Sequence, residues 1–167
     1  NFKQGKTKKI DVLKFEKNLE QNLFQLHRDL EEKKYKHRGY TDFFIRDPKL
    51  RHIYKASVRD RILHHAIYQI LNPIFETMFV ATSFSCRIGK GNHKGVRVAE
   101  AMIRKVSRNY TRSCYVLKCD IRKFFDSIDH SILMSLIVQK IKDPNTLWII
   151  EEVIGSYISE HANLFSR

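Results

Sequence analysis

Apolar residues recur every three or four positions in the first part of the chain, as on one face of an amphipathic helix. They are Leu19, Leu23, Leu26 and Leu30. This spacing predicts one long helix from Asp11 to about Lys36, with Asp11 as its N-terminal cap.

Two short segments follow, residues 42–46 and 51–56, on either side of Asp47-Pro48-Lys49-Leu50. An Asp-Pro pair followed by polar residues is typical of a turn, so these segments predict a β-hairpin. A broad apolar face over residues 57–71 then predicts a helix, which Asn72 and Pro73 are expected to end.

The second half of the chain predicts an irregular loop over residues 80–92, a helix from about Asn92, and a buried strand over Tyr115–Cys119. Further helices are expected at about residues 130–140 and 144–160. Asp129 and Asp143 are expected to cap these helices, and Asp126 to cap the short turn before them. The order of elements indicates an α+β fold that is mostly helical, with an incomplete sheet.

The charge of the chain is strongly positive. There are 31 Lys and Arg against 18 Asp and Glu, a net charge of +13, and residues 77–118 hold nine basic residues and one acid, Glu100. Such an excess predicts a polyanionic partner, either nucleic acid or an anionic membrane surface. The three cysteines do not have the spacing of a disulfide framework or a zinc site, which fits a reducing compartment. No apolar run is long enough to span a membrane. We therefore expect a cytoplasmic location.

Asp120 follows directly after the predicted strand. A carboxylate at a strand end is most often a turn residue or a helix cap. It is also the kind of ligand that Mg²⁺ requires, and the backbone carbonyl of Ile121 could add a second oxygen. Two-metal enzymes that transfer nucleotidyl groups hold a pair of such ions, so Asp120 is a candidate metal ligand.

The ordered string from Tyr115 to Leu133, with Asp120-Ile121-Arg122-Lys123-Phe124 at its centre, resembles the first catalytic-aspartate motif of prokaryotic reverse transcriptases. The resemblance implies that Asp120 binds both Mg²⁺ ions and that Phe124 lies under the incoming sugar and excludes a ribose 2′-hydroxyl. The backbone around Arg122 and Lys123 would face the nucleotide triphosphate. Ordinary core packing is the alternative role for Phe124, and it is the expected role for Phe125.

The segment around the predicted hairpin resembles the fingers hairpin of the same enzymes, in which a Lys and an Arg clamp the triphosphate. By position Arg51 is the first candidate, followed by Lys49 and Arg46. A solvated basic turn is the alternative. The resemblance implies fingers over residues 1–113 and the first part of a palm over residues 114–167 of a right-hand polymerase.

Residues 83–93, Ser-Phe-Ser-Cys-Arg-Ile-Gly-Lys-Gly-Asn-His, most resemble the reverse transcriptases of diversity-generating retroelements, which are related to group II intron and retron enzymes. Because a helix start near Asn92 offers free N–H groups beside basic side chains, this loop could contact a template backbone. The candidate template-binding residues are Arg87, Lys90 and Lys94.

The Asp-Asp pair that completes the metal site of these enzymes does not occur in the sequence. We therefore expect a fingers and partial-palm fragment that is inactive alone, from a protein that copies RNA into DNA with a primer, dNTPs and two Mg²⁺ ions. An accessory protein is a further candidate partner. The alternative is a non-catalytic RNA-binding module with a degenerate polymerase fold. An unrelated magnesium hydrolase would need clustered acidic partners, which the sequence does not offer.

Overall fold

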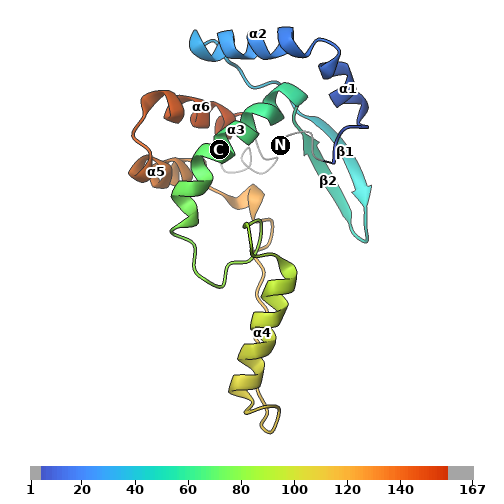
Figure 1. The fold of residues 1–167 in the computed structure, drawn as a ribbon, viewed down its shortest axis with the longest axis vertical. Helices are drawn as coiled ribbons and strands as arrows, with labels where there is room; N and C mark the ends of the chain where they lie inside the picture. The colour runs from blue at the N-terminus through green and yellow to red at the C-terminus, as the bar shows by residue number, and fades with distance from the viewer. Residues whose placement is uncertain (1–4, 158–167) are drawn as a thin grey trace, which may run out of the picture. The chain divides into compact units, whose positions relative to one another are not determined.

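The computed structural model describes residues 5–157. Over these residues the fold is α+β, with six α-helices and one two-stranded antiparallel sheet (Figure 1). The elements are α1 (Ile10–Glu16), α2 (Leu19–Glu31), β1 (Thr41–Arg46), β2 (Leu50–Lys55), α3 (Val58–Glu76), α4 (Asn92–Val106), a 3₁₀ turn η1 (Phe125–Ser127), α5 (His130–Lys140) and α6 (Pro144–Gly155). The predicted α+β class is confirmed.

The described residues divide into two compact units. The first unit holds residues 5–70 and 125–157, and the second holds residues 71–124.

The hairpin of the first unit is confirmed. Strands β1 and β2 pair from Thr41 opposite Lys55 to Arg46 opposite Leu50. The turn between them is closed by the backbone N–H of Asp47, which donates to the carbonyl of Lys49 at 3.2 Å.

The single long helix predicted from Asp11 is wrong, because the chain forms two helices, α1 and α2. Asn18 leaves helical geometry (φ −127°, ψ 46°), and the side-chain amide of Asn22 donates to the carbonyl of Phe15 at 2.9 Å. This bond satisfies one of the carbonyls freed at the end of α1. The four leucines behind the prediction all lie in α2, after the break, so their spacing carries no information on the residues before Asn18.

Asp11 does not cap α1, since Lys9 occupies the cap position. The Asp11 carboxylate instead lies in the first helical turn, where it pairs with Lys55 at 2.8 Å and with Arg61. These two pairs tie α1 to the end of β2 and to α3.

Helix α3 continues through Pro73 to Glu76, so the predicted end at Asn72 and Pro73 is wrong. A proline inside a helix leaves the carbonyl four residues earlier without its N–H partner. That carbonyl belongs to Gln69, which is exposed, so water can hydrate it and the helix need not end.

The core of the first unit lies where α2, α3 and α6 meet. Leu26, Tyr35, Leu63 and Ile149 are its buried members. Partly buried side chains surround them: Leu30, Ile62, Ile67, Trp148 and Val153. The core therefore joins residues that lie more than a hundred positions apart in the sequence.

A buried carboxylate holds the segment after α2 against the start of α3. Asp60 is fully buried and accepts hydrogen bonds from the Tyr35 hydroxyl at 2.8 Å and the Ser57 hydroxyl at 2.6 Å. Burial raises the pKa of Asp60, but the bonds from Ser57 and Tyr35 outweigh it and hold that pKa below its usual value. Beside it, Arg59 pairs with Asp29 at 2.6 Å.

The caps of the last two helices are confirmed. The Asp129 carboxylate accepts from the N–H groups of Ser131 and Ile132, and Asp143 accepts from Thr146 at 2.6 Å. Asp126 does not act as the predicted cap: it lies within η1 and accepts a hydrogen bond from the Tyr157 hydroxyl at 3.0 Å. Helix α6 ends at Gly155, and residues 158–160 of the predicted helix lie outside the described part.

In the second unit, α4 forms as predicted, but Tyr115–Cys119 does not form the predicted strand. Tyr115 is 98% exposed and Leu117 is 88% exposed. A strand requires a neighbour to pair its N–H and C=O groups, and within the described residues no segment pairs with this one. The run is apolar enough for a buried strand, but it lacks the partner that would make it one.

Candidate catalytic and nucleotide-binding residues

The candidate metal ligand Asp120 lies in the second unit, at the end of the extended segment that follows α4. Its side chain is exposed, as is that of Ile121. Within residues 5–157 no group of three or more His, Cys, Asp or Glu side chains is placed to hold a metal ion. One carboxylate and one carbonyl are only part of the oxygen shell that Mg²⁺ requires.

The residues after Asp120 turn away from an extended course. Lys123 has a left-handed backbone (φ 51°), and Phe124 is 49% exposed. Arg122 is exposed as well. Phe125, expected in the core, is 77% exposed and begins η1 in the first unit. The aromatic pair is therefore split between the two units.

The three candidate phosphate ligands lie on the hairpin of the first unit, and all three are exposed. Arg51 is paired with Ile45, whereas Arg46 is paired with Leu50. Because successive side chains of a strand point to opposite faces and paired residues share a face, Arg51 and Arg46 lie on opposite faces of the hairpin. Lys49 lies in the turn between them. Arg51 and Arg46 are thus not placed to approach one phosphate group from the same side.

The candidate template-binding residues of the second unit form hydrogen bonds within their own loop. The guanidinium of Arg87 donates to Glu76 at 2.8 Å and to the carbonyls of Val80 and Ser83 at 2.9 and 3.0 Å. Its ion pair with Glu76 holds the pKa of that carboxyl below its usual range. Arg87 therefore fixes residues 76–87 as a structured loop, a role that the sequence analysis did not assign to it.

Lys90 and Lys94 also bond within this loop. The Lys90 ammonium donates to the carbonyl of Ala81 at 2.7 Å, and that of Lys94 donates to Gly89 at 3.2 Å. Gly95 packs directly against Phe84, with 3.2 Å between the ring and the place of a Cβ atom. The motif over residues 83–93 therefore has a clear structural role, and its contact with a template remains a prediction.

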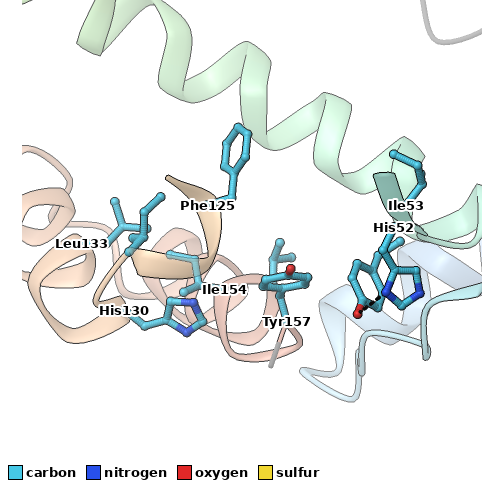
Figure 2. A pocket seen from close by; sticks show the side chains of 10 residues that line it. His52, Ile53, Phe125, His130, Leu133, Ile154 and Tyr157 are labelled. Carbon is cyan, nitrogen blue, oxygen red and sulfur yellow. Dashed lines mark hydrogen bonds between the residues drawn. The ribbon is translucent and has the colours of Figure 1, made fainter. Parts of the chain in front are cut away.

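A pocket of about 420 Å³ opens in the first unit beside the hairpin (Figure 2). Its wall combines aromatic, imidazole and aliphatic side chains from β2, η1, α5, α6 and the residues that follow η1 and α6: His52, Ile53, Tyr54, Phe125, Ile128, His130, Leu133, Val153, Ile154 and Tyr157. Four of its residues, Phe125, Ile128, His130 and Leu133, come from the string over Tyr115–Leu133, and none of the predicted metal or phosphate ligands lines it.

A chain of hydrogen bonds at one side of this pocket joins three side chains of the hairpin. His52 Nε2 lies 2.7 Å from Asp42, and the Tyr54 hydroxyl lies 3.0 Å from His52 Nδ1. Because an ionised carboxylate only accepts, Nε2 carries the proton, and the bond holds the pKa of Asp42 below its usual range. The three residues alternate along one face of the hairpin, which is the signal in the sequence that could have revealed them.

No protein-family profile matches the chain. It is 26% identical to protein YkfC of Escherichia coli over 106 residues, which are 64% of this chain and 27% of that protein. It is 26% identical over 113 residues to nuclear intron maturase 1, mitochondrial, of Arabidopsis thaliana, covering 63% of this chain and 15% of the relative. To nuclear intron maturase 2, mitochondrial, of the same plant it is 22% identical over 150 residues, or 80% and 20% of the two lengths.

The chain thus spans about a quarter or less of the length of these relatives. Two of them carry the name intron maturase, and the identities to all three are low. They support a relationship to the reverse-transcriptase-like family at the level of intron maturases, and they do not single out the diversity-generating-retroelement type.

Proposed function

We propose that this chain is part of an RNA-directed DNA polymerase that extends a primer on an RNA template. The observation that carries the proposal is the order of three motifs along one chain: the hairpin with Arg51, the string over residues 83–93, and the aspartate segment around Asp120. The similarity to intron maturases supports the same family.

In this proposal Asp120 and the carbonyl of Ile121 supply part of the ligand set for Mg²⁺. When bound, the ions would activate the primer hydroxyl and stabilise the leaving pyrophosphate. Phe124 lies under the sugar of the incoming nucleotide, with the backbone of Arg122 and Lys123 toward its triphosphate. Arg51 and Lys49 neutralise phosphate oxygens. Arg46, on the opposite face of the hairpin, is the weaker candidate.

The finer type and partners belong to the same proposal. The string over residues 83–93 favours an enzyme of the diversity-generating-retroelement type, although the relatives carry maturase names. The partners are an RNA template, a primer and dNTPs, with an accessory protein as a further candidate. Among the described residues no helix is long and apolar enough to cross a membrane.

Primer extension on RNA by the protein that contains this chain tests the proposal. In Asp120→Asn we expect the rate to fall about 10³-fold, equivalent to about 4 kcal/mol of transition-state stabilisation, because a metal ligand is lost. Asp126→Asn is the matched control, since it keeps an acceptor for Tyr157 and should retain activity. Phe124→Ala should raise ribonucleotide incorporation.

Extension that persists in Asp120→Asn would refute the assignment. RNA binding without extension by the wild-type protein would instead favour the alternative, a non-catalytic RNA-binding module.

A further inference from the structure

The cations of α4 gather on one side of the helix. At 3.6 residues per turn, its four Lys and Arg residues fall within an arc of about 100°. They are Lys94, Arg97, Arg104 and Lys105. A stripe of apolar residues lies roughly opposite: Ala99, Met102, Ile103 and Val106. The helix therefore has one cationic and one apolar side.

The apolar side faces the rest of the second unit. Its residues line a cavity of about 320 Å³ together with the return segment Cys114–Leu117, which runs beside α4 (Figure 1). Helices that bind membranes bury their apolar side in lipid. Here the return segment lies along part of that side, where Ile103 is half-buried, although Met102 and Val106 stay 51% and 68% exposed. The cations of the other side are all exposed, so that side is the more open to a partner.

The chain turns sharply after α4 through what we name the α4 tip, residues 107–112. Arg108, Asn109 and Tyr110 are consecutive left-handed residues, with φ of 47°, 58° and 66°. Backbone bonds fix this turn, from Asn109 to the carbonyl of Arg104 at 2.7 Å and from Arg112 to that of Ser107 at 2.9 Å.

Ser107 is the buried centre of the α4 tip. Its side chain is 1% exposed, and its hydroxyl accepts from the N–H of Tyr110 at 2.8 Å. Arg108 and Arg112, which both follow Ser107 in the α4 tip, are exposed. The α4 tip is thus a hydrogen-bonded structure that holds two guanidinium groups at the end of the cationic stripe.

Four cations of the stripe and the tip have no counter-charge. The side chains of Arg97, Lys105, Arg108 and Arg112 form no hydrogen bond or ion pair with any residue of the described part of the chain. Arg104 differs, because it pairs with Glu100 at 2.7 Å and lies over the ring of Tyr110 at 5.8 Å. Glu100 is the single acid within residues 77–118, so no other carboxylate of this stretch can neutralise the four.

We propose that these four side chains bind the phosphodiester backbone of a nucleic acid, at a surface additional to the Asp120 segment. Exposed, unpaired cations on a fixed scaffold suit phosphate oxygens, and such contacts read no base sequence. The choice of RNA over DNA rests on the proposed function, whereas the surface itself does not.

Fluorescence anisotropy of the 167-residue chain with labelled nucleic acid, over a range of salt concentrations, tests this surface. We compare the variant Arg97→Gln/Lys105→Gln/Arg108→Gln/Arg112→Gln with the control Lys17→Gln/Arg28→Gln/Lys140→Gln/Lys142→Gln. Both lose four positive charges from exposed positions, and the control residues all lie in the first unit. The probes are an RNA duplex, one of its strands, a DNA duplex of the same sequence, and anionic phospholipid vesicles.

Each phosphate contact adds about 0.9 to the slope of log K against log salt for a duplex, so we expect the α4 variant to lose about 3 to 4 in slope. Its affinity for the RNA duplex should fall about 10²–10³-fold at low salt, and the control should bind as the wild type does. The single variants Arg97→Gln and Arg112→Gln should each lower the slope by about 1, which keeps the test valid if the fourfold variant does not fold.

An equal loss in both fourfold variants would overturn the proposal, because binding would then follow net charge. Loss of vesicle binding with unchanged nucleic-acid binding would overturn it in favour of a membrane surface. Asp120→Asn should leave the slope unchanged. Failure of primer extension with the slope effect intact would therefore refute the polymerase assignment and support this surface.

Discussion

In the first unit, α2, α3 and α6 close over a core of Leu26, Tyr35, Leu63 and Ile149, whereas in the second unit Ser107 is the one buried residue among residues 71–124. Both units contain amphipathic helices. The two units differ in whether the apolar face of a helix packs against the apolar face of another helix. Amphipathic spacing alone therefore predicts that a helix forms, and it does not predict that the helix will be buried.

The two units also use arginine differently. Arg59 is nearly buried in the first unit and pairs with Asp29, beside the buried carboxylate of Asp60. In the second unit Arg87 is equally enclosed, but it holds a loop through Glu76 and two backbone carbonyls. The Arg59 ion pair lies beside a packed apolar core. The bonds of Arg87 hold their loop together where no such core is present among the described residues of the second unit.

Removal of the buried carboxylate should have the largest effect on this contrast. Asp60→Ala leaves the buried Tyr35 hydroxyl without its acceptor and removes a negative charge beside Arg59, so we expect the free energy of unfolding to fall by about 3–5 kcal/mol. Urea denaturation monitored by Trp148 fluorescence measures it. Glu100→Ala, an exposed carboxylate of the second unit, is the control and should change stability little. A similar loss in both variants would contradict the contrast.

Truncation of one apolar side chain in each unit should give the next largest difference. Leu63→Ala opens a cavity in the core of the first unit, and we expect a loss of about 2–5 kcal/mol. Met102 lies on the apolar side of α4 but is 51% exposed, so Met102→Ala should cost less than about 1 kcal/mol. Urea denaturation measures the first, and hydrogen exchange of the α4 amides measures the second. Equal losses would show that α4 is packed as tightly as α3.

The sequence predicted those features that depend on neighbouring residues. The hairpin, the start of α4 and the caps Asp129 and Asp143 follow from turn and capping chemistry over a few positions. The break at Asn18 depends on a bond from Asn22, which no apolar pattern records. A strand at Tyr115–Cys119 would need a second strand to pair with, and the apolar spacing of this segment does not show whether one is present.

The candidate site shows the same limit. Its residue types could be predicted, but the opposite faces of Arg46 and Arg51 follow from the register of the hairpin. The internal bonds of Arg87 depend on how a loop folds back onto Glu76. Neither is visible from spacing.

Acid should weaken the first unit more than the second. Four carboxyls of the first unit contact α2, α3 or the segment after α2, and their pKa values lie below the usual ranges. They are Asp11, Asp29, Asp60 and Glu152. A carboxyl with a lowered pKa stabilises the folded state fully above its unfolded value, near 3.8 for Asp and 4.5 for Glu, and this stability is lost as the pH falls through the folded value. Exchange protection of α3, corrected for intrinsic rate, should therefore decrease below about pH 4.5.

Asp60→Asn should flatten this pH dependence in α3 without any effect on α4. An unchanged dependence in Asp60→Asn would show that Asp60 does not contribute to the acid sensitivity.

The smallest effect should come from two helix ends that share one geometry. Two residues after the end of α2, Lys33 is in a left-handed conformation (φ 55°), and two residues after the end of α4, Arg108 is in the same conformation (φ 47°). Each end carries both bonds of the Schellman motif, in which glycine is the favoured residue. Lys33→Gly should raise the free energy of unfolding by about 0.5–1 kcal/mol, because the Cβ atom that opposes this conformation is removed.

Lys34→Gly is the control for the first end and should destabilise, since Lys34 is not left-handed and glycine only adds freedom to the unfolded chain. Arg108→Gly relieves the same conformation, but α4 is not part of a buried core. Its effect should therefore appear in the hydrogen exchange of the amides of Asn109 and Arg112 and be absent from urea denaturation. A shift of the urea midpoint by Arg108→Gly as large as that by Lys33→Gly would mean that the two units unfold together, and the contrast between a packed and an open unit would then not extend to their stability.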